Sequence, residues 1–513
     1  MRLACIVLAG FAVGLSGCAG GAEAEGQRPS GSVGVTQAGA QDAAHFRRLV
    51  EEDRIPEPSL LDQVGFFAEH ALEQPEADCG EVICTHPSLA VAPRFDDGTW
   101  TMAFVSLNSA VDPETRPRQP VHLVLAVESS PAASELTKSG AALFDAVLAE
   151  LEPDDRLSVL SFGSEPEVLV RGAIPAESDL SDLTLPITSG PDLVDLYSGI
   201  AAAEGALSSL PDFVGTSRIV LLTTGRADAG ITDRARIEAL AESLVRQGTP
   251  FSVVGMSDSF EADLPRGIAE LGAGNYAFAE TSEDLQNLVV QEAGVRLVPL
   301  ASDVALRVVP SPGYSVGRIY GARRASVEDG VAVLRSPAMY LGARSTMDPM
   351  EPTEDRRGGG GGLFVELVGD PSMAAEIGAG QPAFRLETSY RDIDAEADVS
   401  FEAEVVNDLS PAERPSENWP HFSTPEYGKA FMMLNMYLAL RAMVDLYAAG
   451  DCGSALGTSY MMEPGAEEWQ KRFDDPDIEE DRYIMLRLAE NIFNECRAVP
   501  VPPSNYEAGC FGL

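Results

Sequence analysis

The chain carries little positive charge. It has 36 Lys and Arg residues against 80 Asp and Glu residues in 513, which gives a formal net charge of -44. Binding to phosphate backbones or anionic lipid headgroups depends on Lys and Arg, so a strongly acidic field disfavours both. We therefore expect no nucleic-acid partner, and we interpret most of the acidic residues as solvated surface.

Histidine is also scarce. Five His residues are a thin supply for general acid–base chemistry, and His122 lies inside an apolar run. No Gly-x-Ser-x-Gly turn surrounds Ser129 or Ser130, and the glycines at 358–362 lack the following Lys-Ser or Lys-Thr of a phosphate-binding loop. The sequence therefore predicts a protein that is not an enzyme.

Long apolar runs are missing except at the start. Arg2 precedes an apolar run from Leu3 to Leu15, which is shorter than the roughly 20 residues needed to cross a bilayer and is typical of a secretory signal peptide. Its end, Leu15-Ser16-Gly17-Cys18, resembles the bacterial lipobox. The resemblance implies a lipoprotein signal peptide over 1–18, with Cys18 as the lipidated first residue of the mature protein. The alternative is an ordinary signal peptide with an incidental cysteine.

This anchor would be the only contact with a membrane. No Asp directly follows Cys18, and the lipobox resemblance then favours the outer membrane in a cell that has one. Residues 19–44 are mostly Gly, Ala, Ser, Gln and Glu, a composition that buries too little apolar surface to offset its ordering entropy. We expect this segment to be a flexible tether between the membrane and the folded part.

Cysteine usage agrees with export. Cys79 and Cys84 flank Gly80 and could close a small disulfide loop in an oxidising compartment. A zinc site is the alternative, but it needs ligands beyond His86.

Three further cysteines lie near the C-terminus. Two of Cys452, Cys496 and Cys510 are expected to pair, and the sequence does not decide which. We favour Cys452 with Cys496, because this bond would join the ends of a long helical segment to its neighbour.

The centre of the chain alternates between strand and helix patterns. The run Pro120–Ala133 is apolar up to Glu128 and then breaks at Ser129-Ser130-Pro131, as expected for a strand buried on both faces of a parallel sheet. Further strands and helices alternate to residue 296, which predicts an α/β, doubly wound domain over 119–296. Ligands of such sheets bind beyond the carboxyl ends of the strands, here around Glu128 to Ser130.

The flanks have different patterns. Residues 45–118 contain two helical stretches and a hairpin signal at Asp96-Asp97-Gly98, and residues 297–410 contain five strand-like runs. We infer a β-sandwich with strands from both sides of the central domain, so that this domain is an insertion. Residues 411–513 are expected to be helical. Tyr427 to Ala448 has core-like spacing and should pack on Tyr483 to Phe493, with a solvated acidic segment at 467–481 between them.

Several segments resemble a known family. The central domain is similar to the von Willebrand factor type A (VWA) domain, which has a Rossmann-like fold, and the sequences before and after it are similar to those of bacterial YfbK-type proteins. The resemblance spans about residues 45 to 340. The segments that carry it are HLVLAVESS, LEPDDRLSVLSFGSEPEVLV, RIVLLTTGRADAGITD, GTPFSVVGMSDSFEADLPRGIAELGAGNYAFAET, HFRRLVEEDRIPEPSLLDQVGFFAEH and LASDVALRVVPSPGYSVGRIYGARR.

The resemblance implies a metal site that this chain does not preserve. In the family, a divalent cation is held by Asp-x-Ser-x-Ser after the first strand, by a Thr from a second loop and by the Asp of a Thr-Asp-Gly turn. The matching positions here are Glu128, Ser130, Ala132, Val194 and Thr224. A hard cation needs oxygen ligands, so we expect a degenerate site without metal or any other cofactor.

Two alternatives remain open at this site. Counting back without gaps from residues 153–156 puts Ala126 and Glu128 at the Asp and first Ser positions, and this register does not restore the pattern either. Asp192 or Asp195 could replace the Thr in a remodelled loop, which would keep a site for Mg²⁺ or Ca²⁺.

These features predict an envelope-anchored lipoprotein. The leading hypothesis is protein–protein interaction or scaffolding through a metal-independent VWA domain, with an unidentified envelope or extracellular protein as partner. A second hypothesis is metal-dependent adhesion to an acidic partner group, and a third is a passive structural lipoprotein without a partner. The sequence gives neither the partner nor the oligomeric state.

Overall fold

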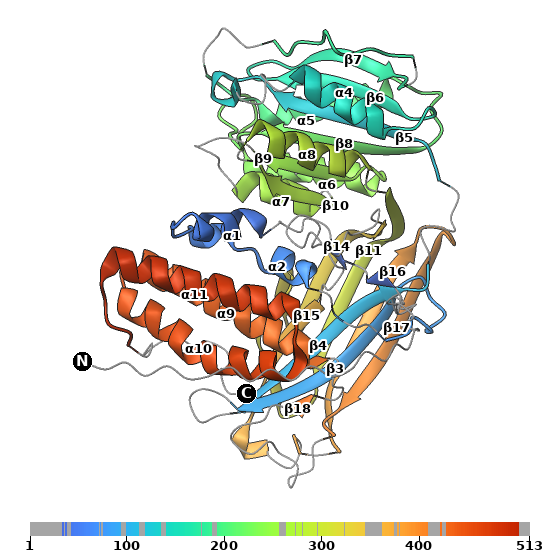
Figure 1. Cartoon of the computed structure of the whole chain (residues 1–513). Coiled ribbons are helices and arrows are strands. Elements are labelled where there is room, and N and C mark those ends of the chain that lie inside the picture. The colour runs from blue at the N-terminus through green and yellow to red at the C-terminus, as the bar shows by residue number, and fades with distance from the viewer. Residues whose placement is uncertain are drawn as a thin grey trace, which may run out of the picture.

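A computed structural model describes residues 33–34, 36–37 and most of 43–501 (Figure 1). Within the last range the residues left undescribed are 71, 73–74, 94–98, 112–117, 135–139, 176, 187–191, 256–262, 272, 280, 295, 323, 344–361, 374–376, 379, 409–420 and 423–426. Among the described residues, no helix combines the length and the apolar character needed to cross a membrane.

The central domain is built on a six-stranded sheet. The strand order is β10-β9-β8-β5-β6-β7, in which the first five strands are parallel and β7 is antiparallel to β6. The central strand, β5, has no polar face, because helices cover both faces of the sheet. The strands are β5 (Val121–Glu128), β6 (Arg156–Phe162), β7 (Glu167–Ala173), β8 (Thr216–Thr223), β9 (Phe251–Gly255) and β10 (Ala273–Phe278).

Helices cover both faces of this sheet. Val124 and Ala126 of β5 pack toward α5 (Leu196–Ser208), α6 (Arg234–Arg246) and α7 (Asp263–Leu271). Leu123, Leu125 and Val127 pack on the opposite face toward α4 (Gly140–Glu150) and α8 (Ser282–Gly294). A short 3-10 turn, η2 (Pro131–Ala133), follows β5. The predicted doubly wound α/β fold is confirmed.

Two antiparallel sheets form a sandwich beside this domain. The inner sheet has the order β12-β15-β4-β3-β18, and the outer sheet has the order β13-β14-β11-β16-β17. Leu89 and Val105 of the inner sheet share a core with Leu306 and Leu386 of the outer sheet. The bounds are β3 (Cys84–Pro93), β4 (Thr99–Ser109), β11 (Arg296–Pro310), β12 (Tyr314–Tyr320), β13 (Ala325–Glu328), β14 (Val331–Ala343), β15 (Gly362–Gly369), β16 (Pro382–Asp392), β17 (Ala397–Val406) and β18 (His421–Phe422). A 3-10 turn, η3 (Pro371–Met373), follows β15.

The sandwich takes strands from both sides of the central domain. β15, from after the insertion, lies between β12 and β4, and β4 precedes the insertion. The predicted combination of an inserted α/β domain and a β-sandwich is therefore present. The sequence prediction omits β12, β13 and β18.

Two short strands lie inside the segment predicted to be a flexible tether. β1 (Val33–Gly34) pairs with Ser109 and Asn108 of β4, and β2 (Thr36–Gln37) pairs with Met339 and Tyr340 of β14. For these four residues the tether prediction is wrong. Pairing on the backbone needs no large side chains, so the polar composition did not reveal it. The signal peptide and Cys18 lie outside the described residues.

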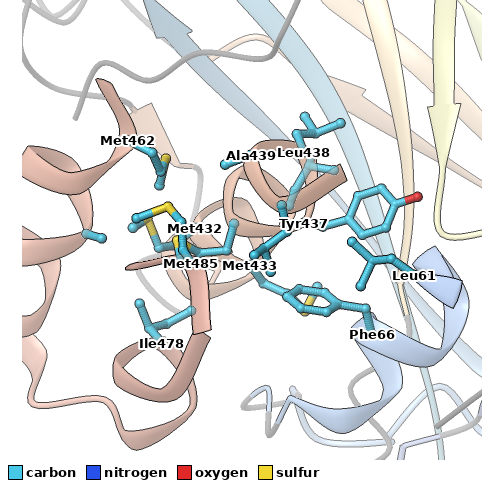
Figure 2. Packing of buried hydrophobic residues seen from close by; sticks show 14 of the residues in the cluster. Leu61, Phe66, Met432, Met433, Tyr437, Leu438, Ala439, Met462, Ile478 and Met485 are labelled. Atoms are coloured by element: carbon cyan, nitrogen blue, oxygen red, sulfur yellow. The ribbon is translucent and has the colours of Figure 1, made fainter. Parts of the chain in front are cut away.

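Helices cover the other face of the inner sheet (Figure 1). Phe104 and Phe364 of the sheet lie in one core with the helices, and α9 runs through the middle of that core. Figure 2 shows Phe66 and Leu61 facing Tyr437 of α9, while Met462, Met485 and Ile478 close the opposite side. The elements are α1 (Ala44–Glu51), η1 (Pro58–Leu60), α2 (Gln63–Glu69), α9 (Tyr427–Ala448), α10 (Cys452–Phe473) and α11 (Pro476–Cys496).

The helical layer contains α10, which the sequence prediction omits. α10 spans part of the acidic segment 467–481 that was expected to be solvated. For Asp481 that expectation is wrong: its side chain is 1% exposed and is bonded to Arg47 and to His70. The predicted pairing of Tyr427–Ala448 with the segment 483–493 is present as contact between α9 and α11.

Both favoured disulfides are present. Cys79 bonds to Cys84 next to the start of β3, and Cys452 bonds to Cys496, which joins the first residue of α10 to the last residue of α11.

Candidate functional site

Three loops meet at the carboxyl edge of the central sheet. One follows β5 at Glu128, one precedes α5 at Asp195, and one follows β8 at Thr223. Because β5, β6 and β8 are neighbouring parallel strands, their carboxyl ends lie at the same edge, where ligands of such sheets bind. We call these three loops the apex.

Glu128 is the central side chain of the apex. It is fully buried at the last position of β5, and its Oε1 accepts a hydrogen bond from the Ser130 hydroxyl at 2.5 Å. Its Oε2 accepts from the Thr223 hydroxyl at 2.8 Å and from the Thr224 amide at 2.7 Å. The Thr224 hydroxyl lies 2.8 Å from Oε1 and 2.9 Å from Oε2. The carboxylate therefore joins the loop after β5 to the loop after β8.

This arrangement satisfies the carboxylate without a cation. A carboxylate offers about four lone-pair sites, and the two threonines and Ser130 supply four donors to Glu128. A divalent cation needs the same carboxylate oxygens as ligands and would have to displace these hydrogen bonds. Thr224 supplies only a neutral hydroxyl where the family motif has an Asp. The residues at the apex therefore fit a closed hydrogen-bonded cluster better than an oxygen cage.

The other matched positions supply no side-chain oxygen. Val194 is fully buried in the core beneath α5, and its amide donates to Asp228 Oδ1 at 2.7 Å. The amide of Ala132 donates to Asp192 Oδ1 at 3.3 Å. Ala126 is buried within β5, so the structure places Glu128 and not Ala126 beside Thr224.

Asp192 and Asp195, the two possible substitute ligands, have other partners. Asp195 caps α5, because its Oδ1 accepts from the Ser198 amide at 2.9 Å and its Oδ2 from the Ser198 hydroxyl at 2.8 Å. Asp192 accepts from Arg226 Nη1 at 2.8 Å. The same guanidinium donates through Nε to Asp228 Oδ2 at 2.9 Å. Arg226 thus bridges the loop before α5 and the loop after β8.

The backbone after β8 depends on glycine. Gly225 has a φ of 86°, a left-handed conformation that residues with a Cβ rarely adopt. Its amide donates to Thr223 Oγ1 at 3.0 Å, which leaves that hydroxyl's proton directed at Glu128. The turn therefore holds Thr223 and Thr224 in their positions as donors to Glu128.

The apex contains residues that the sequence analysis did not single out. Thr223 belongs to the cluster around Glu128, whereas Arg226 and Asp228 join the loop before α5 to the loop after β8. All three lie within five residues of Thr224 in the sequence. Their closeness to Thr224 in the sequence was the only signal that could have found them. The sequence around them does not show which side chains form hydrogen bonds within the apex.

His122 lies at the opposite edge of the sheet. Its Nε2 is 2.9 Å from the Ser158 hydroxyl, which also accepts from the Gly172 amide at 3.0 Å. Burial, helped by the positive charge of Arg156, lowers the pKa of His122 to about 4. The ring is therefore neutral at pH 7 and is separated from the apex by the length of β5. Among the residues that the structure describes, no group of three His, Cys, Asp or Glu side chains is arranged to hold a metal ion.

Comparison with known proteins gives a partial match. No family model matches the chain. Over 174 residues, 32% of this chain, it is 25% identical to the uncharacterized protein YfbK of Escherichia coli K12. The match spans only 29% of YfbK.

Solved structures with a similar fold include a von Willebrand factor type A protein from Catenulispora acidiphila, with a TM-score of 0.48 and 14% identity over 76% of this chain and 88% of that one. Another is the ArnB paralog VWA2 from Sulfolobus acidocaldarius, with a TM-score of 0.41 and 16% identity over 80% of this chain and 97% of that one. The match to YfbK covers part of each chain, and the likeness to the two solved structures is one of fold.

Proposed function

We propose that the protein is an exported, lipid-anchored binding or scaffolding protein of the cell envelope. It binds a protein partner through the apex of its VWA-type domain, and this binding requires no metal ion. The anchor is the lipid on Cys18, which places the folded domains outside the membrane that holds them. Catalysis is not part of this role.

One observation carries the proposal. The Glu128 carboxylate, at the position where the family motif has a metal-ligating Asp, takes four hydrogen bonds from Ser130, Thr223 and Thr224. A buried polar group with all its bonds made gains little from exchanging them for a cation, because the hydroxyls would then lose their own acceptor. These filled hydrogen bonds support an apex that binds its partner without a metal ion.

The metal part of this proposal is tested by calorimetry. Titration of the purified protein with Mg²⁺, Mn²⁺ or Ca²⁺ should give no saturable heat. The matched control is the triple variant Glu128→Asp, Ala132→Ser, Thr224→Asp, which puts the family residue at three motif positions and should gain measurable Mg²⁺ binding. Saturable binding by the unchanged protein would favour the metal-dependent adhesion role.

The partner part is tested by capture from envelope extracts with and without EDTA. Capture that EDTA does not change supports the proposal, EDTA-sensitive capture supports metal-dependent adhesion, and no capture supports a passive structural role. Leu193 is an exposed apolar residue of the apex, and Val214 is an exposed apolar residue at the opposite edge. Leu193→Asp should reduce capture, whereas the control Val214→Asp should not.

A further inference from the structure

The exposed aromatic side chains gather on one pair of helices. Among the described residues, the aromatic side chains that stand out as exposed are Tyr460 of α10, and Tyr483 and Phe493 of α11, at 77%, 50% and 46% exposure. Leu486 of α11 is 41% exposed. Aromatic side chains are enriched at protein interfaces, and contiguous exposed apolar groups mark binding surfaces. Single exposed apolar residues are common on protein surfaces, but a group of them on two neighbouring helices indicates a binding surface.

These side chains share one outward face. Tyr483, Leu486 and Phe493 follow a spacing of three and seven residues, which places them along one stripe of α11. The opposite stripe is buried, with Ile484, Leu488 and other residues in the core around α9. The helix thus presents apolar residues on both its inner and its outer side.

The neighbouring helix places Tyr460 beside this stripe. α10 and α11 are antiparallel, since the disulfide joins Cys452 to Cys496 and Arg482 donates to Glu463 at 2.6 Å. In this register Tyr460 is level with residues 485–488 of α11. The register therefore places Tyr460 of α10 at the height of Leu486 on the neighbouring helix.

The chain beyond α11 continues the apolar surface. Val499 and Val501 are 77% and 51% exposed, and the Val501 amide donates to the Gly453 carbonyl at 2.9 Å. This bond holds the segment against the start of α10, at the end of the pair that contains Phe493. We call Tyr460, Tyr483, Leu486, Phe493, Val499 and Val501 the hairpin face.

The negative charge around the hairpin face favours a positively charged partner. The segment 452–497 contains eleven Asp and Glu residues against five Lys and Arg residues. Glu479 and Glu490 lie on the same stripe of α11 as the exposed apolar side chains, Glu467 lies on α10, and about half of each of these three side chains is exposed. A second copy would bring two acidic surfaces together, in a chain with a net charge of -44, and like charges across an interface oppose binding. A basic rim on the partner would instead pair with these carboxylates.

We propose that the hairpin face is a docking site for an amphipathic helix of a partner protein, with an apolar stripe bordered by Lys or Arg. The groove between two antiparallel helices accepts a third helix by packing of ridges into grooves, and the stripe on α11 has the spacing that such packing uses. This site is separate from the apex of the VWA-type domain and does not depend on the role proposed for that apex.

The test uses a synthetic amphipathic helix of about 18 residues, roughly five turns, with Leu on one face and Lys on its borders. A matched peptide carries Glu in place of each Lys. Fluorescence anisotropy should show that the full protein binds the Lys peptide and not the Glu peptide. The double variant Tyr460→Ser, Leu486→Ser should weaken binding about tenfold, the loss expected when anchors at the centre of an interface are removed. The control Val214→Ser, at an exposed site on the central domain, should bind as the unchanged protein does.

Each other outcome overturns the proposal. Equal loss in the double variant and the control, or no loss in either, would mean that the Lys peptide binds the acidic surface at large. Concentration-dependent self-association that the double variant abolishes would identify a second copy as the occupant. Absence of Lys-peptide binding would mean that the hairpin face is covered or does not accept a helix. EDTA should change none of these readouts, which separates this test from that of the apex.

Discussion

Glu128 and Asp481 are both buried carboxylates, but their surroundings differ. Glu128 accepts only from neutral donors, namely the hydroxyls of Ser130, Thr223 and Thr224 and one amide. Asp481 lies between two cationic groups: Arg47 Nη2 is 3.2 Å from its Oδ1, and His70 Nε2 is 2.7 Å from its Oδ2. The first joins loops of one domain, and the second joins the N-terminal segment to α11.

The two clusters show two ways to bury a carboxylate. Neutral donors stabilise the charge of the carboxylate by hydrogen bonding. If the carboxylate is removed, the groups that remain are uncharged. Cationic donors also neutralise it, but loss of the carboxylate leaves Arg47 with only its longer ion pair to Glu480 and leaves His70 without its charged acceptor. We therefore expect the two clusters to respond to mutation by different amounts, and to pH through different groups.

The largest effect is expected at Asp481. Asp481→Ala leaves Arg47 and His70 buried without their carboxylate and should lower the free energy of unfolding of the helical layer by about 3–5 kcal/mol. Urea unfolding followed by tryptophan fluorescence measures this, because Trp469 lies in that layer. Glu490→Ala is the matched control on the same helix, at an exposed ion pair with Arg487, and should cost no more than about 1 kcal/mol. Equal losses in the two variants would contradict the comparison.

A smaller effect is expected at Glu128. Glu128→Ala leaves the hydroxyls of Ser130, Thr223 and Thr224 buried without their acceptor, which should cost about 1–3 kcal/mol. Thermal unfolding of the central domain measures this, with Glu167→Ala at an exposed position of β7 as the control. A loss larger than that of Asp481→Ala would show that the neutral donors do more than solvate the carboxylate.

The pH-dependent effects involve one proton each, and the two histidines should change stability with pH in opposite directions. Burial alone would lower the pKa of His70, but the charge and hydrogen bond of Asp481 outweigh it, with Asp477 contributing, so the pKa is raised. His70 Nδ1 also faces the Phe66 carbonyl at 2.7 Å, so both ring nitrogens face acceptors and both must carry a proton to donate. Arg47 is the nearby cation, and it also faces Glu480 at 3.6 Å.

The sign follows from proton binding. Above pH 6.5 the folded state holds a proton on His70 that the unfolded state has released, so stability should fall as pH rises through the raised pKa. For His122, with its pKa lowered to about 4, the unfolded state binds the extra proton, and stability should fall as pH drops from 6.5 toward 4. The free energy of unfolding is measured from pH 5 to 9 for both variants. His70→Gln should lose the fall in stability at high pH, and His122→Gln should lose the fall at low pH. A variant that keeps its slope would show that another group titrates there.

Much of the fold was predictable because its signals are local. The strand at Val121–Glu128 and the helix at Tyr427–Ala448 follow from continuous apolar runs and helical spacing, and both have the predicted residues. α10 was missed because Gly453, Gly457 and Pro464 weaken its helical pattern, and its burial comes from packing between α9 and α11.

The two carboxylate clusters were not equally predictable from the sequence. Glu128 could be found, because it ends an apolar strand and matches a motif position, although its donors could not be assigned. Asp481 could not be found. Its partners Arg47 and His70 lie more than 400 residues away in the sequence, and its neighbours in the sequence are acidic residues that suggest a solvated segment.

The insertion of the central domain has a consequence for the order in which the newly synthesised chain can fold. β3 and β4 emerge early, but β15, which pairs with β4 along Thr101–Ser106, emerges only after the whole inserted domain. α1 likewise waits for α11, close to the end of the chain. Until then the edge of the early hairpin that β15 will cover stays open to pairing with other strands, which exposes the hairpin to aggregation.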